Sequence, residues 1–402
     1  SVETELNYKT ISINYFKLMT NKISDLICNN EFVIKTGDVK RDIRVTKLAE
    51  RVGYKKSVNQ LIVKTVKLGD ACVKVTPSGL SVFSPENAFK VVNIHNVNET
   101  KAIVLYEPLV TNIGNIKQIR HIRFEIHFKG KIYECVREYV GGLVGTVGQA
   151  VNYEFNGRMI PKEGNWYDTG IKDTELVQWL SINKEADGVY GESIYEDIQD
   201  IVFAMEKRIT VTNAELDSLA HPWTIIGMSG MDETEYGYKP KLVDGKYMIV
   251  DDRAPDKVVT PQSFQQEYKL DNSESMLDIL RGYFYELSEM GKTFLSGEYG
   301  GNISEETLNN TIKSAIDKAN RIVTEVYDQL RDSLYVLCKL NGISINKEDI
   351  TLTFNIGRTD DDMKVAEISK TLIESGILSK HTVRNRYFGY NEEQSIEEQA
   401  QI

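Results

Sequence analysis

The chain has 402 residues, of which 41% are hydrophobic and 27% charged, so it is typical of globular protein and long enough for two or three packed units. Its formal net charge of −11 at pH 7 argues against a surface that grips nucleic acid by neutralising phosphates, because such a surface needs clustered Lys and Arg. The cysteines (Cys28, Cys72, Cys135, Cys338) form no CxxC, so we expect core thiols in a reducing compartment and neither a zinc site nor a disulfide framework. No apolar run approaches the ~20 residues that cross a bilayer, so we expect no membrane span.

The first half of the chain changes from a helical to a β period. Apolar residues recur at helical spacing from Ile11 to Cys28 and again from Val58 to Leu68, where Gly69 ends the helix. β-branched and aromatic residues then alternate, with a hairpin turn at Lys129-Gly130-Lys131. The predicted strands are Ala71–Val75, Leu80–Phe83, Lys101–Tyr106, His121–Phe128, Lys131–Tyr139 and Ala150–Phe155. These segments predict two opening helices followed by a β-rich unit.

The second half contains two helices separated by a small insert. Ser193-Ile194-Tyr195-Glu196 has the pattern of a capping box, and the apolar stripe after it predicts a helix to Leu219. Trp223–Met228 and Tyr247–Val250 read as strands of the insert, with glycines and prolines supplying turns. The stripe of Met276, Ile279, Leu280, Tyr283, Leu287 and Met290 predicts the second helix, Glu274–Met290, which stops at Gly291.

A long helix dominates the end of the chain. Apolar residues recur at steps of three and four from Leu308 to Leu337, Ser304 can cap the start, and Gly342 suits the left-handed residue that ends helices. A helix from Ser304 to Leu340 would be roughly 55 Å long. A glycine-rich segment, Lys292–Asn302, precedes it, and a strand at Ile350–Phe354 and a helix at Asp360–Gly376 follow it.

Two glycine-containing motifs resemble nucleotide sites but lack their context. Gly291-Lys292-Thr293 matches the tail of a P-loop, yet the required earlier glycine is Glu286 and the triplet follows a helix rather than a strand. Strands flank Gly142–Gly148 on both sides, which favours a hairpin loop over a dinucleotide-binding turn.

No catalytic or metal constellation is evident in the sequence. His121 and His127 have no third ligand at a diagnostic spacing, and Asp360-Asp361-Asp362 lacks the glycine and alternation of a calcium loop. No G-x-S-x-G turn occurs. The segment Lys292–Asn302 is the irregular stretch that fits a functional loop, and a plain mobile connection between helices fits it equally well.

Several segments, in order along nearly the whole chain, together resemble the portal proteins of tailed double-stranded DNA bacteriophages. They are Asn14–Asn29, Leu68–Val75, Tyr190–Ile198 leading to Leu216–Leu219, and Leu352–Asn355 through Gly376–Thr382. The resemblance implies an α+β, portal-like fold with a β-rich wing, long stem helices, a strand-containing clip, a long spine helix and a short helical crown. It divides the chain into wing 1–190, first stem helix 191–221, clip 222–270, second stem helix 271–291, tunnel loop 292–303, spine helix 304–342 and crown 343–402.

The same resemblance implies two candidate sites. A tunnel loop facing DNA would contain Lys292, Thr293, Phe294, Leu295, Glu298, Tyr299 and Asn302. A clip that docks head-completion or adaptor proteins would contain Trp223, Ile225, Tyr236, Tyr238, Tyr247 and Ile249.

The function implied by the resemblance is that of a ring, of twelve copies as in the family, at one capsid vertex. Double-stranded DNA would pass through it without sequence specificity during packaging by a separate terminase motor, retention and ejection. Major capsid and scaffolding proteins would be further partners in the virion, with assembly in the host cytoplasm, no membrane, no cofactor and no enzymatic activity. Two alternatives stay open: another ring component such as an adaptor, which is usually much shorter, or an enzyme with a scattered site.

Overall fold

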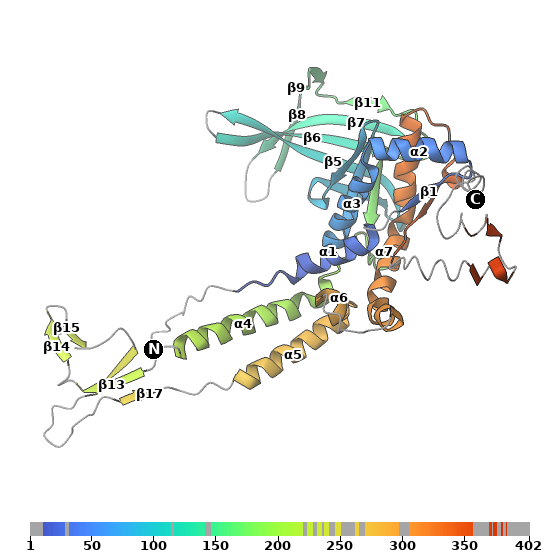
Figure 1. Ribbon diagram of the computed structural model, residues 1–402. Helices are drawn as coiled ribbons and strands as arrows, with labels where there is room; N and C mark the ends of the chain where they lie inside the picture. The colour runs from blue at the N-terminus through green and yellow to red at the C-terminus, as the bar shows by residue number, and fades with distance from the viewer. Residues whose placement is uncertain are drawn as a thin grey trace. The chain divides into compact units, whose positions relative to one another are not determined.

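The computed structural model describes residues 11–28, 32–113, 116–140, 146–219, 223–227, 231–234, 237–240, 246–250, 262–264, 270–296, 305–356 and, beyond these, 370–371, 373–375, 379–380 and 383. It confirms the α+β class. The chain forms two compact units, a smaller one of Ser1–Tyr15 with Asp197–Ser288 and a larger one of Phe16–Glu196 with Glu289–Ile402. Figure 1 shows the elements of both units along the chain.

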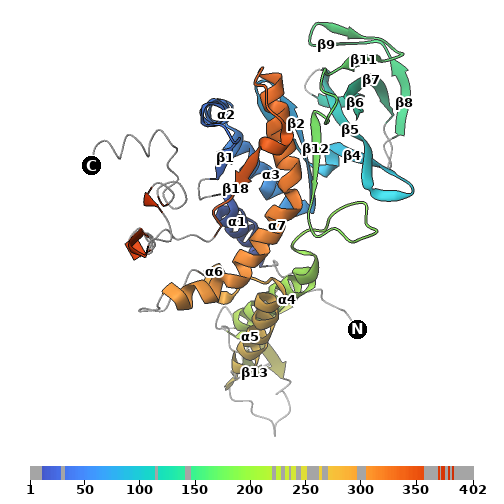
Figure 2. The ribbon, with the colours of Figure 1, turned by 90° about the vertical axis from the view of Figure 1, so that its right-hand side faces the viewer.

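The larger unit is built in layers. Helices α3 (Tyr54–Leu68) and α7 (Glu305–Leu340) pack on a three-stranded sheet in the order β12-β2-β3, formed by Val177–Ser181, Asp70–Thr76 and Gly79–Phe83. The Tyr54 hydroxyl donates to the Leu330 carbonyl at 2.8 Å and so joins α3 directly to α7. The other face of this sheet packs on a second, larger sheet, and the two share a buried cluster: Cys72, Val177 and Trp179 from the first, and Ala88, Ile103 and Leu105 from the second (Figure 2).

The larger sheet is antiparallel and six-stranded. Its order is β11-β7-β6-β5-β4, with β8 also paired to β7. The strands are β4 (Ala88–Asn93), β5 (Asn96–Ile113), β6 (Ile116–Phe128), β7 (Lys131–Val140), β8 (Thr146–Val151) and β11 (Asn165–Asp168). The predicted turn joins β6 to β7, with Lys129 and Gly130 at φ 49° and 69°. A Cβ at Gly130 would lie 2.4 Å from the Ile171 carbonyl oxygen, so glycine is required there by both its φ and its surroundings.

Two elements near the amino terminus have no counterpart in the prediction. Helix α2 (Val39–Arg51) begins after Asp38, whose side chain accepts a hydrogen bond from the Lys40 amide at 3.0 Å. Strand β1 (Val33–Lys35) pairs with β18 (Thr351–Thr353), which is the strand predicted at Ile350–Phe354. A highly charged helix and a three-residue strand carry little periodic signal, so a sequence pattern misses both. Helix α1 (Tyr15–Cys28) also begins four residues later than predicted.

The long helix ends as predicted. Gly342 has φ 71°, the Ile343 amide donates to the Cys338 carbonyl at 2.9 Å, and the Gly342 amide donates to the Lys339 carbonyl at 3.1 Å. This is the glycine-terminated stop that the sequence indicates. The four cysteines are free and buried, in agreement with the expectation of core thiols.

Two chain segments cross closely at Gly69 and Gly191. A Cβ at Gly191 would lie 2.4 Å from the Ile182 carbonyl oxygen and 2.5 Å from that of Gly69, so a larger residue would have to displace backbone. Beside this crossing, the buried Asp70 carboxylate accepts hydrogen bonds from Trp179 Nε1 at 2.7 Å, Ser181 Oγ at 2.5 Å and the Gly191 amide at 2.9 Å. Asp70 therefore ties strand β12 and the chain that enters the smaller unit to the start of β2.

The smaller unit contains the two predicted helices and the insert between them. Helices α4 (Gln199–Leu219) and α5 (Leu270–Leu287) lie side by side (Figure 1). In the insert, β13 (Trp223–Gly227) pairs parallel with β16 (Lys246–Val250) and antiparallel with β17 (Gln262–Phe264). Strands β14 (Met231–Thr234) and β15 (Gly237–Pro240) form a hairpin. The predicted insert strands are thus confirmed.

Two helix boundaries differ from the prediction. The capping box at Ser193 does not form: Ser193 Oγ donates to the Lys67 carbonyl at 2.9 Å and accepts from the Tyr195 amide at 3.2 Å, and α4 begins after a 3₁₀ turn at Glu196–Ile198. The tertiary contact with Lys67 uses the hydroxyl that a cap would need. Helix α5 begins at Leu270 and ends at Leu287, because Glu289 takes a left-handed φ of 56°.

Candidate functional site

The segment predicted as an irregular tunnel loop begins with a helical turn. Helix α6 (Lys292–Ser296) follows Gly291, whose carbonyl accepts from the amides of Phe294 at 3.0 Å and Leu295 at 3.2 Å. Residues 297–304 lie outside the described residues, and so do the predicted positions Glu298, Tyr299 and Asn302. The irregular reading is therefore wrong for the first five residues, where local hydrogen bonding and burial favour a helix.

Burial separates the described residues of this segment into two groups. Phe294 and Leu295 are buried, and Lys22 Nζ of α1 lies 5.9 Å from the centre of the Phe294 ring. These two side chains are largely withdrawn from solvent in the single chain, and their DNA-facing role stays a prediction. Lys292 is exposed and Thr293 is half-buried. A DNA-facing role stays a prediction for these two.

Glu289, which the sequence reasoning missed, fixes the start of this segment. Its carboxylate forms an ion pair with Arg321 and lies 3.7 Å from Lys318 Nζ, and both cations belong to α7. The residue holds these contacts while it occupies a φ that is uncommon for a side chain other than glycine. Glu289 thus couples the chain that precedes α6 to the long helix. A charged residue next to a helix end is a weak signal, and its partners, about thirty residues away, are not visible in the sequence.

The predicted clip residues are distributed over several strands. Trp223 and Ile225 lie on β13, Tyr247 and Ile249 on β16, and Tyr238 on β15; Tyr236 lies outside the described residues. The parallel register pairs Ile225 with Met248 and Ile226 with Ile249. The predicted residues on β13 and β16 are therefore near neighbours in one sheet without being cross-strand partners, and docking of a partner stays a prediction.

The exposed apolar side of α5 is the second surface feature of the smaller unit. Of the stripe that predicts this helix, Met276, Ile279, Tyr283 and Leu287 are exposed, Tyr283 by 56%. The buried positions Ser273, Phe284 and Ser288 lie on a neighbouring side of the helix, and the Phe284 ring is 4.9 Å from that of Tyr15. Helix α4 adds further exposed apolar residues: Phe203, Val211 and Leu216. Long side chains left in water at helical spacing indicate a surface that another molecule covers.

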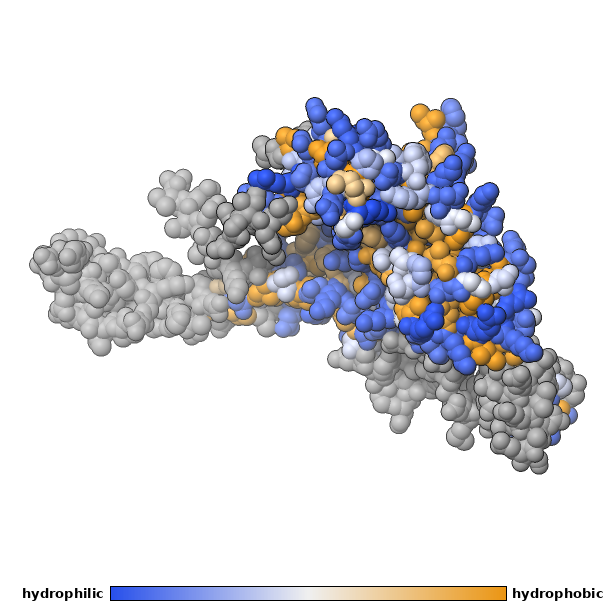
Figure 3. Space-filling model, turned by 90° about the horizontal axis from the view of Figure 1, so that it is seen from above, coloured by the Kyte–Doolittle hydropathy of each residue, from blue (hydrophilic) through white to orange (hydrophobic). Residues whose placement is uncertain are grey.

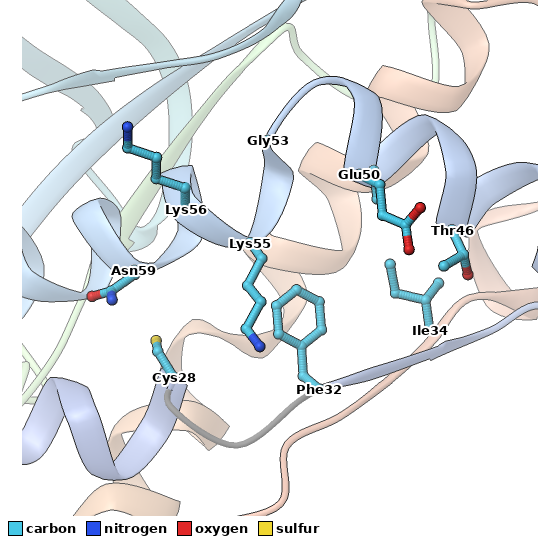
Figure 4. Close-up of a pocket in the computed structure, with 10 residues that line it drawn as sticks. Cys28, Phe32, Ile34, Thr46, Glu50, Gly53, Lys55, Lys56 and Asn59 are labelled. Carbon is cyan, nitrogen blue, oxygen red and sulfur yellow. The ribbon is translucent and has the colours of Figure 1, made fainter.

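A cavity of about 660 Å³ lies in the larger unit beside α2 and α3 (Figure 4). Its lining is Cys28, Phe32, Ile34, Thr46, Ala49, Glu50, Gly53, Lys55, Lys56 and Asn59. Burial raises the pKa of the Cys28 thiol to about 12, against the opposing effect of Lys55, so the group is a poor nucleophile at neutral pH. The lining brings together no nucleophile with an activating base, and we assign it no chemistry.

The described part of the chain contains neither a membrane-spanning helix nor a cluster of metal ligands. No helix there is long and apolar enough to cross a membrane. Within the same residues, no group of three or more His, Cys, Asp or Glu side chains is arranged to hold a metal ion.

Comparison with known proteins gives a family match over almost the whole chain. A model of the family described as "Phage portal protein, SPP1 Gp6-like" matches residues 3–402. No curated protein sequence matches.

Among solved structures, the chain is similar to chains of a gene transfer agent (GTA) particle, each at 11% identity. One is from the virion of the native particle, with TM-score 0.43 and coverage of 92% of this chain and 88% of that one. Another is from the neck of the empty particle computed with C6 symmetry, with TM-score 0.45 and coverage of 93% and 89%. A third is from the neck of the native particle computed with C12 symmetry, with TM-score 0.43 and coverage of 92% and 88%.

Proposed function

Because the chain belongs to the SPP1 Gp6-like family of phage portal proteins, we propose that it assembles into a closed ring at one capsid vertex and forms the channel for DNA. The family match over residues 3–402 is the observation that carries this proposal. The ring contains twelve copies, and double-stranded DNA passes through it without sequence specificity. Packaging, retention and ejection of the genome are the three processes that it serves.

The surface of the smaller unit supports assembly into a ring. The exposed apolar residues of α5 and those of α4 are different sets on different helices. A contact between two different surfaces is heterologous, and such contacts close into rings when the rotation between neighbours allows it. We assign the α5 stripe of one copy to a neighbouring copy, because a closed ring removes this apolar area from water on every subunit.

The charge of the chain suits a conduit for DNA. A net charge of −11 per copy, repeated around a ring, disfavours adhesion of a polyanion that must slide. The exposed Lys292 at the start of the tunnel-loop segment would be a local exception, placed to contact phosphates individually.

The remaining roles follow from the same proposal. The protein is a structural component of the virion and catalyses no reaction itself, so a separate terminase motor supplies the work of packaging. The clip docks head-completion or adaptor proteins, and the wing meets the major capsid and scaffolding proteins. Assembly takes place in the host cytoplasm.

Negative-stain electron microscopy of the purified protein tests the proposal. Rings with a central hole are the expected result at micromolar protein. Monodisperse particles of single-chain size, over the same concentration range and in the presence of scaffolding protein, would contradict it.

A further inference from the structure

The six-stranded sheet of the larger unit has one face covered by the protein's own chain. Strand β2 lies over this inner face, where Lys74 Nζ is 2.5 Å from the Glu125 carboxylate, and Glu125 also pairs with Arg123 and His127. Burial alone would raise the pKa of Glu125, but hydrogen bonds from His127 and Lys74 hold it well below its usual range. The inner face thus buries charged side chains as well as apolar ones.

The hairpin of β9 (Tyr153–Phe155) and β10 (Arg158–Ile160) covers more of the inner face. Ile160 of this hairpin is fully buried against Leu109 and Val136 of the sheet. Arg158 forms an ion pair with Glu134, which is buried on the same side. Sheet residues on this face therefore have partners within the chain.

The opposite face, which we call the outer face, carries an apolar row from edge to edge. The register pairs Phe89 with Val104, Val104 with Ile126, Ile126 with Tyr133, and Tyr133 with Trp166. Residues paired directly across antiparallel strands share a face, so this row spans β4, β5, β6, β7 and β11. Phe89 and Trp166 at its two ends are 40% and 60% exposed.

The outer face continues as apolar surface along the strands. The pairing of β5 with β6 shifts between Leu109 and Val110, where the extra residue belongs to β6, so alternation along β5 keeps Val110 on the face of Val104, and Val110 pairs with Ile119. The pairing of β7 with β8 shifts between Arg137 and Tyr139, where the extra residue belongs to β8, so alternation along β7 keeps Tyr139 on the face of Tyr133, and Tyr139 pairs with Val147. The exposed large apolar residues that share this face are Phe89, Val91, Val110, Ile119, Val147 and Trp166. Figure 3 shows how apolar side chains reach the surface of the described residues between polar ones.

The middle of this face is buried, with Val104 and Ile122 at 5% and 8% exposed, whereas the apolar residues towards its edges are exposed. The loop before β11 reaches its edge, where the Tyr133 hydroxyl donates to the Glu163 carbonyl at 2.8 Å. The main elements that contact the sheet among the described residues, the β12-β2-β3 sheet and the β9–β10 hairpin, lie on the inner face. A solvated antiparallel sheet normally directs its polar residues outward. Here apolar residues point outward while ion pairs are buried, which is the pattern of a sheet covered on both faces in its assembly.

Charge identifies the kind of partner. By alternation, the outer face places two exposed cations, Lys131 and Arg137, and one exposed anion, Asp168, around the apolar row. This surface is slightly basic on a chain whose net charge is −11. An acidic partner is attracted to it, and a second copy of this chain is such a partner.

We propose that the outer face of the six-stranded sheet, centred on the row from Phe89 to Trp166 and extended by Val110 and Ile119, docks against a neighbouring copy of this chain. The proposal rests on assembly into a ring and adds a second contact, in the larger unit, to the one formed by α4 and α5. Neighbouring subunits are then joined at two separate places, which resists tilting of one against the next.

Charged substitutions on and off the outer face test this contact. Val110→Glu and Trp166→Glu place a carboxylate on the face. Met159→Glu, at a position with nearly the same exposure, and Ile94→Glu, at a more exposed one, place a carboxylate elsewhere in the same unit. Native mass spectrometry and multi-angle light scattering measure the ring fraction, and circular dichroism confirms folding. We expect at least a tenfold loss of rings at a fixed concentration for the first pair and no loss for the second.

A cysteine accessibility measurement keeps the test decisive if a charged variant fails to fold. Val110→Cys introduces an exposed thiol into a chain whose four native thiols are buried. Maleimide should label it at least tenfold more slowly in rings than in single chains obtained by dilution, while Met159→Cys labels equally in both. Rings that form normally with both glutamate variants, or that leave Val110→Cys freely labelled, overturn the contact and leave the portal function intact. A wild type that never assembles overturns both proposals.

Discussion

Replacing Asp70 by alanine removes the carboxylate at the crossing of Gly69 and Gly191. Three donors then lose their acceptor: Trp179 Nε1, Ser181 Oγ and the Gly191 amide, at 2.7, 2.5 and 2.9 Å. A buried donor left unpaired costs about 1–3 kcal/mol. Trp179 is buried, while Ser181 and Gly191 are half-buried and regain some hydration. We therefore expect Asp70→Ala to lower the free energy of unfolding of the larger unit by about 3–5 kcal/mol.

Asp70→Asn separates the loss of hydrogen bonds from the loss of volume. Asparagine keeps one carbonyl oxygen as the acceptor for Trp179 and Ser181 but places an amide nitrogen opposite the Gly191 amide. A smaller decrease of about 1–2 kcal/mol is expected. Asp187→Ala, at an exposed position of the same unit, should change stability by no more than ~0.5 kcal/mol.

Urea unfolding, followed by tryptophan fluorescence and by far-UV circular dichroism, measures these differences. If the two probes give the same transition, unfolding is two-state and a free energy of unfolding can be calculated for each variant. A midpoint for Asp70→Ala that coincides with that of Asp187→Ala would refute the view that this carboxylate holds the crossing together.

Three further outcomes are expected. Ile279→Asp on the exposed stripe of α5 should reduce the ring fraction measured by light scattering at least tenfold, whereas Glu274→Lys, on another side of the helix, should leave it unchanged; equal effects would argue against the stripe as a contact. Burial lowers the pKa of Lys90 to about 8, partly opposed by Asp70, from an ordinary value of 10.5. The unfolded chain keeps this proton to higher pH than the folded chain, so Lys90 makes the free energy of unfolding increase as pH rises from about 8 towards 10.5. Urea unfolding of wild type should show this increase, and urea unfolding of Lys90→Met should not. Glu289→Ala loses the ion pairs to α7 and retains a left-handed φ, so it should lower stability by about 0.5–1 kcal/mol, while Glu289→Gly relieves the φ and should be near neutral; a larger loss in glycine than in alanine by thermal denaturation would contradict this.

Local patterns in the sequence were enough for the elements whose residues repeat regularly. The long helix α7 and its stop at Gly342 follow from apolar spacing and one glycine. The hairpin at Lys129-Gly130 and the strands on both sides of it follow from alternation. In these segments the signal and the structure it specifies lie within the same few residues.

Contacts between distant segments decided the features that sequence reasoning missed or assigned wrongly. Ser193 has the spacing of a helix cap, but its hydroxyl binds Lys67, which is 126 positions away. Phe294 lies in a stretch that reads as a loop, and its side chain is buried.

For the exposed side of α5 and the outer face of the six-stranded sheet, the sequence likewise predicts the element, and the tertiary structure decides which of its sides is covered. Alternation predicts that each strand has two faces, but only register and layering decide which of them the chain covers. The periodic pattern indicates that Ile279 and Trp166 lie among other apolar residues, but it does not indicate what packs against them. The sequence by itself determined the elements, because backbone hydrogen bonding and side-chain period are local; the tertiary structure alone decided which apolar surfaces are buried within one chain and which are left for another.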